Sequence, residues 1–542
     1  MNQYVWKLKA KPPPKKSQGW LLRLLAQNRG LTSPKSLKEF LNPALEVILQ
    51  VKLTDMEKGK KRVLEALKNK EKIIVYADYD ADGLCATAIM WETLHDLGAN
   101  VMPYVPHRIK EGYGMSKPAI DEMAKQGVKL IVTVDQGVTA VEQVDHAKKL
   151  GIDIVITDHH VLPKILPKAI ALVHTTDLCG GGVAWRFCWE IVKTANPRNR
   201  EKLLEKLELA ALATIADLVP LVGANRAIVK LGLAKLTKTK RPGILALIRE
   251  SRISRTVTTY EIGHILAPRI NAMGRIEHGL TALRLLCTKN QKQADKLASL
   301  LAKTNTRRQD LTTKAVAAAL TMVEEEALIG IVSHKDWHEG VIGLVASRLV
   351  ESYNRPMVAI AVGSEFSKGS ARSIPGFNIV EAIRFSSEFI IDGGGHPMAA
   401  GFTIRTKHIE LFRQNLEKYA QKTITDDILE RIINIECELA PQDITAENLK
   451  IIKSFEPYGV GNQPPSFLTR NMLVEDVRAV GAESQHLKLQ VGGFPAIGFN
   501  LGRDRAAIRP GYPIDLVYTI EEDNFNGSSN LQLKIRDLAL RN

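Results

Sequence analysis

The chain has 542 residues, with 74 Lys or Arg against 59 Asp or Glu, and a formal net charge of +15. Its 45% hydrophobic content is ordinary for a globular protein of several domains and argues against general disorder. The 5 cysteines are an odd number without Cys-x-x-Cys spacing, which argues against a disulfide framework or a zinc ribbon. The absence of a long apolar run or signal-like start predicts a cytoplasmic protein without membrane association.

Residues 1–50 are predicted to form a basic leader punctuated by prolines, with a short helix at Trp20–Leu25. Residues 1–70 hold 16 Lys or Arg against 5 Asp or Glu, a net charge of +11. Such a segment would attract a polyanionic strand and make its binding sensitive to salt. A solvated lysine-rich helix face with a flexible tail is the open alternative.

Residues 51–290 alternate between strand and helix signals. Three short runs rich in β-branched residues, 73–77, 130–134 and 153–157, are typical of buried parallel strands. Each run precedes an aspartate: Asp78, Asp135 and Asp158. Because ligands bind at the carboxyl ends of strands in an open α/β sheet, we expect these three side chains to share one rim.

Four strings in this region carry the candidate metal ligands: Asp78-Tyr-Asp80-Ala-Asp82-Gly83, Thr133-Val-Asp135-Gln-Gly137, Thr157-Asp158-His159-His160 and Ile215-Ala-Asp217. Carboxylates gathered at one place repel one another unless cations neutralise them, and oxygen ligands with imidazole suit Mn²⁺ or Mg²⁺. The pattern therefore predicts a pair of divalent ions. The alternative for each aspartate is a helix N-cap, and 158–160 alone would also fit a surface turn.

Residues 291–326 have few helix breakers and predict a long connecting helix. Strand character resumes at 327 and opens a second α/β unit over 327–435. Within it, Gly393-Gly-Gly-His396 is predicted to be a glycine-rich loop whose N–H groups approach phosphate. Ser370, Arg372 and Ser373 add hydroxyl groups and a guanidinium that match phosphate geometry.

Residues 440–542 contain several short segments of alternating polarity, which predict a small β barrel. A barrel that binds single strands combines stacking aromatics with contacts to the backbone. The candidate stacking residues are Phe455, Tyr458, Phe467, Phe494 and Phe499. Each of them has barrel core as its alternative.

The order of these motifs carries a family resemblance. Besides the strings above, the chain contains five further motifs in the order of the family: Leu212–Leu221, Ala267–Arg275, Trp337–Gly343, Gly369–Ser373 and Gly393–His396. From about residue 70 onward the chain resembles the DHH phosphoesterase superfamily and, within it, the RecJ family of single-strand-specific 5′ to 3′ DNA exonucleases. It departs from the family pattern at Gln136, where asparagine is common, and in the stretch that follows Leu178, but neither departure removes a ligand.

The resemblance implies an α/β fold: a parallel-sheet DHH domain, the connecting helix, a DHH-associated domain and a C-terminal OB-like barrel. It implies two Mn²⁺ or Mg²⁺ ions bridged by Asp135 and held by Asp78, Asp80, Asp82, Asp135, His159 and Asp217. The catalytic group would be Asp135, His159, His160 and Asp158, with His160 contacting phosphate and Asp158 orienting an imidazole. Implied substrate contacts are Arg269, Asn271, Arg275, His338, Ser370, Arg372, Ser373, Gly394, Gly395 and His396.

Three function classes follow. The first is a metal-dependent exonuclease on single-stranded DNA in repair and recombination, whose 5′ to 3′ polarity and partners, a single-strand-binding protein or a helicase, rest on the resemblance alone. The second is a phosphodiesterase acting on nano-oligonucleotides or cyclic dinucleotides. The third is a non-enzymatic replication scaffold, which the full set of ligand types disfavours. The basic leader, long helix and barrel favour the first class over the second.

Overall fold

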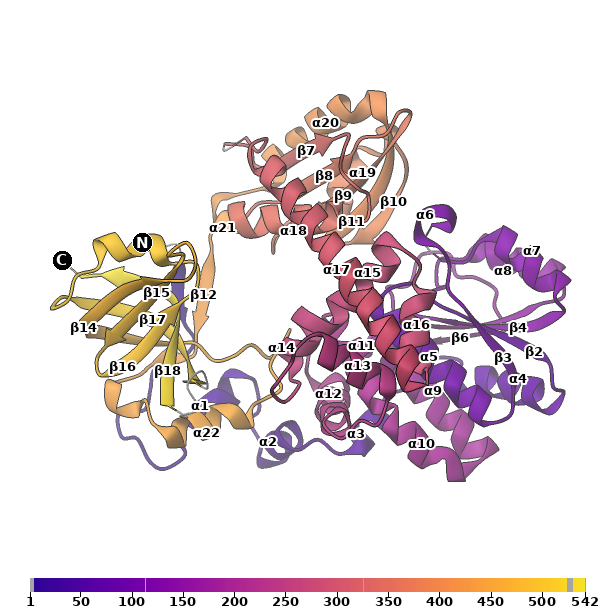
Figure 1. Cartoon of the computed structure of the whole chain (residues 1–542), viewed down its shortest axis with the longest axis horizontal. Helices are drawn as coiled ribbons and strands as arrows, with labels where there is room; N and C mark the ends of the chain where they lie inside the picture. Colours follow the sequence, from indigo (N-terminus) through magenta and orange to yellow (C-terminus); the bar gives the residue numbers. More distant parts are fainter. Residues whose placement is uncertain (1–3, 113, 325, 524–529, 542) are drawn as a thin grey trace. The chain divides into compact units, whose positions relative to one another are not determined.

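A computed structural model describes residues 4–541 except 113, 325 and 524–529. The predicted leader and barrel therefore include a few positions outside the described residues. The chain divides into two compact units (Figure 1). The parallel-sheet unit comprises residues 42–313 and 457–462, and the barrel unit comprises residues 1–41, 314–456 and 463–542.

A five-stranded sheet in the order β3-β2-β4-β5-β6, parallel at every pairing, forms the centre of the parallel-sheet unit. Its strands are β2 (Lys72–Tyr76), β3 (Asn100–Tyr104), β4 (Val128–Val134), β5 (Asp153–Asp158) and β6 (Ala171–His174). Residues that alternate along β2 belong to two different cores, since Ile73 and Val75 lie in one and Ile74 and Tyr76 in the other. Both faces of the sheet are therefore covered, and the predicted α/β fold class is confirmed.

Helices pack on both faces of this sheet, and further helices pack against them. The helices of this unit are α3 (Leu45–Leu49), α4 (Met56–Lys68), α5 (Ala81–Asp96), α6 (Arg108–Glu111), α7 (Lys117–Lys125), α8 (Val141–Lys149), α9 (Gly180–Ala195), α10 (Arg200–Glu205), α11 (Leu207–Ala216), α12 (Gly223–Leu236), α13 (Pro242–Glu250), α14 (Thr259–Glu261), α15 (Ala267–Ile276) and α16 (Leu280–Cys287). A π-helical turn, Ile262–Leu266, joins α14 to α15. The helix α17 (Gln291–Leu320) occupies most of the range where the sequence predicts a connecting helix.

The barrel unit contains a second sheet in the order β10-β11-β9-β8-β7. Its strands are β7 (Gly330–His334), β8 (Met357–Ala361), β9 (Phe366–Arg372), β10 (Ile390–His396) and β11 (Ala399–Arg405), and its helices are α18 (Ile342–Tyr353), α19 (Ile379–Phe385), α20 (Ile409–Thr423) and α21 (Asp426–Leu429). The predicted glycine-rich loop is wrong, because Gly393–His396 belongs to the edge strand β10. A Cβ on Gly393 would lie 3.1 Å from Phe402 Cβ and one on Gly395 would lie 2.3 Å from Ala399 O, whereas a Cβ on Gly394 would have no described atom within 4 Å.

A closed barrel forms the C-terminal part of this unit, as the sequence predicts. Its order is β14-β15-β16-β18-β17, and β17 pairs back to β14. The strands are β14 (Phe467–Val480), β15 (His486–Val491), β16 (Phe494–Gly498), β17 (Pro513–Asp523) and β18 (Asn530–Leu540), with the short β13 (Cys437–Glu438) beside β14 and α22 (Ala446–Ser454) before it. Closure leaves these five strands without a free sheet edge.

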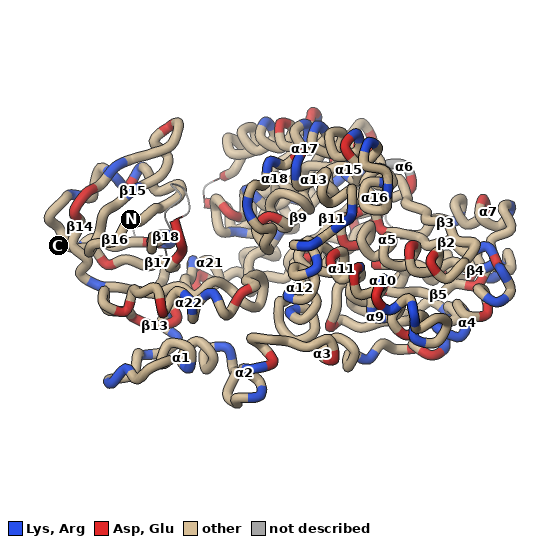
Figure 2. The backbone as a smooth tube through the Cα atoms, turned by 60° about the horizontal axis from the view of Figure 1, so that its bottom comes forward, with Lys and Arg blue, Asp and Glu red and all other residues tan. Residues whose placement is uncertain are grey.

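The N-terminal leader is folded as part of the barrel unit over residues 4–41, and its last residues, 42–50, belong to the parallel-sheet unit. Strand β1 (Val5–Leu8) pairs in parallel with β12 (Ile432–Ile435), and α1 (Trp20–Asn28) and α2 (Pro34–Leu41) follow it. Trp6 Nε1 donates to Asp537 Oδ2 at 2.7 Å, and Asn28 Nδ2 donates to Glu436 Oε2 at 2.7 Å. Basic residues recur along this segment (Figure 2). The leader is thus a structured element, although the sequence left a flexible tail open.

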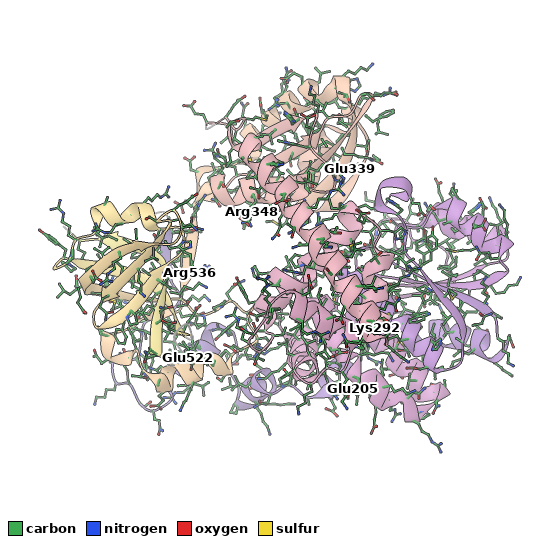
Figure 3. The ribbon with its side chains drawn as sticks, viewed as in Figure 1. Glu205, Lys292, Glu339, Arg348, Glu522 and Arg536 are labelled. Atoms are coloured by element: carbon green, nitrogen blue, oxygen red, sulfur yellow. The ribbon has the colours of Figure 1, made fainter. Side chains whose placement is uncertain are left out.

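Ion pairs are spread over the surfaces of both units. Glu205, labelled in Figure 3, accepts from Lys235 at 2.7 Å, and Arg348 donates to Glu351 at 2.7 Å. Exposed pairs of this kind contribute at most about 1 kcal/mol each, so the stability of the fold depends on its cores. Among the described helices, none has the length and hydropathy needed to cross a bilayer.

Candidate metal centre

The carboxyl ends of the central strands bring the predicted acidic residues together. Asp158 is the last residue of β5, Asp135 directly follows β4, and Asp78 lies two residues after β2. Asp82 lies in the first turn of α5, and Asp217 follows the end of α11. Burial is unusually deep for carboxylates, since Asp78 is 6% exposed and Asp82 and Asp135 are each 2% exposed.

Three groups of side chains place their ligand atoms within 4.8 Å of one another. They are Asp78 with Asp80 and Asp135, Asp82 with His159 and Asp217, and Asp135 with His159 and His160. The first two groups share no residue, while the third links them through Asp135 and His159. This arrangement suits two ions that lie close together, and it contains all six predicted ligands. His160, which the sequence assigns to phosphate, also lies within ligand distance.

Backbone donors fix the carboxylates on the α5 side of the site. Gly180 N and Gly181 N, at the start of α9, donate to Asp82 at 2.8 and 2.6 Å. Asp80 is the N-cap of α5 and accepts from Gly83 N at 3.0 Å. The capping alternative is therefore true of Asp80, but the cap occupies one carboxylate oxygen and leaves the other for a metal.

Asp135 shows most directly that the site fits a cation. Its backbone has a φ of 61°, a left-handed conformation that is uncommon for residues other than glycine. Its Oδ1 has no hydrogen-bond partner among the described residues, although it lies 3.1 Å from His159 Nε2. A buried carboxylate oxygen without a donor is costly, and a divalent ion is the partner that relieves this cost.

Asp158 holds the second histidine of the string. Its Oδ1 lies 2.8 Å from His160 Nδ1 and accepts from His159 N at 2.7 Å, while its Oδ2 accepts from Val138 N at 3.0 Å. His174 Nε2 lies 2.8 Å from the His160 carbonyl oxygen. The imidazole of His160 is thus oriented through Nδ1.

The electrostatics of the site favour protons or cations. Burial first, and repulsion from Asp80 second, raise the pKa of Asp82 to about 7. Burial and the charge of Asp82 raise the pKa of Asp217 to about 9, and burial and neighbouring carboxylates also raise the pKa of Asp135. Burial acts to lower the pKa of His160, but the Asp158 contact outweighs it and raises this pKa to about 9. Divalent cations would relieve the carboxylate repulsion.

Family models match three parts of the chain: the DHH family N-terminal domain at residues 72–216, the DHHA1 domain at 313–422 and the RecJ OB domain at 435–537. The single-stranded-DNA-specific exonuclease RecJ of Bacillus subtilis is 36% identical over 540 residues, covering 96% of this chain and 68% of its own. The Escherichia coli protein of the same name is 31% identical over 557 residues, covering 96% of this chain and 95% of its own. The chain belongs to the RecJ family.

A solved RecJ structure supports the metal assignment. The crystal structure of Thermus thermophilus RecJ in complex with Mn²⁺ matches with a TM-score of 0.87 and 30% identity, covering 100% of this chain and 80% of that chain. A second structure of that protein, in complex with Mg²⁺, matches with a TM-score of 0.81. The ions in these RecJ structures are the two that the oxygen-rich donor set of this chain predicts.

Three of the residues predicted to contact substrate lie on helix α15: Arg269, Asn271 and Arg275. Asn271 Oδ1 accepts from Ala81 N at 2.7 Å, so its amide holds the start of α5, where Asp80 and Asp82 lie. Arg269 Nη1 donates to Ile265 O at 2.8 Å, while its buried Nε has no partner among the described residues. Burial also lowers the pKa of Arg269, as expected of a cation that an anionic ligand would compensate.

The second sheet places four of the remaining candidates in two rows across three strands. Gly394 pairs with Gly401, which pairs with Ser370, and His396 pairs with Ala399, which pairs with Arg372. Residues paired in register point to the same face of a sheet, so all four share one face that is lined by small residues. Arg372 Nη1 donates to Ser370 Oγ at 3.1 Å, which fixes the guanidinium on this face.

The other candidates of the barrel unit have local roles. Ser373 Oγ donates to Phe377 O at 2.6 Å and the residue is 5% exposed, so its hydroxyl is used within the chain. His338 Nδ1 accepts from Gly340 N at 3.0 Å. A side chain on Gly395 would lie 2.3 Å from Ala399 O, so this position needs glycine for strand pairing. None of these contacts tests a role in binding.

Two features of the centre were missed from the sequence. Gly180 and Gly181 bind Asp82 through their backbone, and only the glycine run at the start of a helix signals them. Arg108 places its guanidinium 5.0 Å from the ring centroid of Tyr79 and acts to lower the pKa of Asp78, against burial and the charge of Asp80. A lone arginine at the start of the four-residue helix α6 carries no recognisable pattern.

The aromatic candidates of the OB barrel separate into core and surface. Phe455 and Phe467 are fully buried. Phe499 is 52% exposed, and its ring lies 5.1 Å from that of His486 and 5.7 Å from Lys534 Nζ. Phe499 is therefore a surface residue, Tyr458 and Phe494 are partly exposed, and Phe455 and Phe467 stabilise the fold.

Proposed function

We propose that the protein is a metal-dependent exonuclease that hydrolyses phosphodiester bonds of single-stranded DNA. The observation that carries the proposal is the meeting of two ligand groups, joined by Asp135 and His159, at the rim of the parallel sheet. Support comes from the curated RecJ relatives, which are named single-stranded-DNA-specific exonucleases. The third sequence-based class, a scaffold with a degraded site, is disfavoured because every ligand type is present.

The residues of the centre divide into holding and orienting roles. Asp78, Asp80, Asp82, Asp135, His159 and Asp217 would hold two Mn²⁺ or Mg²⁺ ions, with Asp135 between them. Such ions supply a hydroxide nucleophile near neutral pH and neutralise charge on the phosphodiester. Gly180 N and Gly181 N keep the Asp82 carboxylate in place. Asp158 orients His160, which is proposed to contact a phosphate oxygen.

The face formed by Ser370, Arg372, Gly394 and His396 is proposed to bind the phosphates of the strand. A guanidinium matches the geometry of a phosphate, and glycine leaves the backbone open to close approach. Arg269 and Arg275 are proposed as further phosphate contacts. The 5′ to 3′ polarity, the role in repair and recombination, the single-strand-binding protein or helicase partner and the cytoplasmic location stay predictions.

The test is a time course on single-stranded, double-stranded and RNA substrates labelled at either end, with Mn²⁺, Mg²⁺ or excess EDTA. We expect single-stranded DNA to be shortened from the 5′ end only when metal is present. Persistent activity after dialysis against EDTA would contradict the metal mechanism. Hydrolysis confined to dinucleotides or cyclic dinucleotides would instead support the phosphodiesterase alternative.

A further inference from the structure

An exposed stack of three side chains lies on the surface of the parallel-sheet unit. The ring of Tyr260, on α14, is stacked on that of His264 with centroids 4.5 Å apart and planes 19° apart. The guanidinium carbon of Arg255 lies 5.5 Å from the Tyr260 centroid. Tyr260 is 52% exposed, which is high for a large aromatic residue that serves only to fill a core.

The start of the helical segment that carries the stack is held by a capping box. Thr258 N and Oγ1 donate to Glu261 Oε2 at 2.8 and 2.6 Å, and Glu261 is 1% exposed. Arg255 Nε donates to the other oxygen of Glu261 at 2.7 Å. His264 Nδ1 lies 3.2 Å from Tyr260 O. Because the ring pair is already ordered, a planar ligand that binds to it loses little conformational entropy in the protein.

The segment that carries the stack leads directly to the metal centre. The π-helical turn Ile262–Leu266 follows α14 and continues into α15, and π-helical turns are frequent at functional sites. Asn271, on α15, accepts from Ala81 N, and a side chain on Gly274 would lie 2.5 Å from Tyr79 O. Tyr260 lies 11 residues before Asn271, a span of about 16 Å at the helical rise of about 1.5 Å per residue.

We infer that Tyr260 and His264 form a stacking platform for a base of the single strand that is cut at the metal centre. The inference rests on the proposed function, since it needs a strand that extends beyond the scissile phosphate. Aromatic rings stack on every base, so the platform would add affinity without sequence preference. The Arg255 charge is paired with Glu261, which makes ring stacking, and not phosphate neutralisation, the main contribution.

The competing interpretation is that the rings only stabilise their own helix. A side-chain pair at this spacing has a small effect on helix stability and none on ligand binding. The two interpretations differ for substrates of different length. A platform about 16 Å along the helix contributes to binding of a long strand but not of a dinucleotide. The ratio of the two KM values therefore separates substrate stacking from a general loss of structure.

The experiment compares Tyr260→Ala and His264→Ala with the wild type on a long single strand and on a dinucleotide. We expect Tyr260→Ala to raise the KM ratio of long strand to dinucleotide by about 10-fold, with an unchanged salt dependence. Tyr260→Phe keeps the ring and should restore the ratio. Leu150→Ala, which truncates another exposed apolar side chain of the same unit, is the matched control.

A direct readout is the fluorescence of 2-aminopurine placed at successive positions of a strand bound to the Asp135→Asn protein. Stacking should quench one position in that protein, and the additional Tyr260→Ala change should abolish the quenching. An unchanged KM ratio, an equal rise in both KM values, or quenching that survives Tyr260→Ala would overturn the platform. If the wild type degrades no single strand in Mn²⁺, the proposed function itself fails, whereas the three outcomes above overturn the platform alone.

Discussion

Replacing Gly180 with alanine should damage the metal centre without changing any ligand. Gly180 is the first residue of α9, and its N–H donates to Asp82 Oδ2. A Cβ at this position would lie 2.5 Å from Cβ, Cγ and Oδ1 of Asp135, whereas ordinary contacts begin near 3.4 Å. The Asp135 carboxylate, or the start of α9, must therefore move by about 0.9 Å.

A displacement of this size has a large effect on catalysis and a small effect on stability. Misplacing a reacting or positioning group by about 1 Å can cost about 100-fold in rate. Overpacking costs about 1–3 kcal/mol, but alanine is favoured over glycine inside a helix by about 1 kcal/mol. We expect Gly180→Ala to lower kcat at least about 100-fold and to weaken Mn²⁺ binding, with a net destabilisation of about 0–2 kcal/mol.

The measurements are initial rates on an end-labelled single strand, Mn²⁺ titration by calorimetry and urea unfolding. Gly182→Ala is the matched control, since its Cβ would meet only apolar atoms, Leu178 Cβ at 3.1 Å and Ile228 Cδ1 at 3.3 Å. This variant should lose some stability and keep its metal affinity. Wild-type rate and Mn²⁺ affinity in Gly180→Ala, or equal loss of metal in Gly182→Ala, would refute the reasoning.

Three further predictions concern charge. Asp135→Asn should abolish hydrolysis while circular dichroism shows a folded chain; wild-type turnover with saturating Mn²⁺ would contradict its bridging role. Arg372→Ala should raise KM for single-stranded DNA about 10-fold or more while calorimetry shows unchanged Mn²⁺ binding, and loss of metal would count against a phosphate contact. In EDTA, thermal stability should fall as pH rises from 5 to 9. Burial and mutual repulsion raise the pKa values of Asp82 and Asp217 to about 7 and 9 in the folded chain, from an unfolded value of 3.8. The folded chain therefore holds more protons than the unfolded chain in this range, and its stability decreases as these protons are lost. Mn²⁺ should reverse the fall, and Asp217→Asn should reduce it; a slope in EDTA that Asp217→Asn leaves unchanged would contradict the assignment.

The acidic side chains of the centre could be predicted because two simple regularities act together. Buried parallel strands are recognisable from β-branched runs, and the carboxyl ends of such strands share one rim. Asp78 and Asp135 follow two such strands and lie in one ligand group, and Asp158 ends the third strand and holds His160, which lies in a ligand group with Asp135. Charged residues next to apolar runs are conspicuous in a sequence, and their repulsion itself predicts the cation.

Features that depend on pairing between distant segments could not be predicted. Strand β1 is only four residues long and pairs with β12 more than 400 residues later. Nothing local to Val5–Leu8 indicates that partner. The strand β10 was predicted as a loop for a different reason: consecutive glycines weaken strands in general. Here the backbone of the neighbouring strand β11 approaches closely, since a Cβ on Gly395 would lie 2.3 Å from Ala399 O, so glycine suits this strand pairing.

The supports of the metal centre show where sequence reasoning stops. The groups that bind Asp82 are the backbone N–H groups of Gly180 and Gly181. The Asp135 side chain fits beside α9 because Gly180 has no side chain. Backbone N–H groups occur at every residue except proline, and a missing side chain has no charge, so neither marks a position in the sequence. A sequence therefore predicts which side chains would bind a metal more readily than what holds them in place. In this protein the second question is decided by the first turn of α9, where a Cβ on Gly180 would lie 2.5 Å from the Asp135 side chain that links the two ligand groups, so that either Asp135 or the start of α9 would have to move.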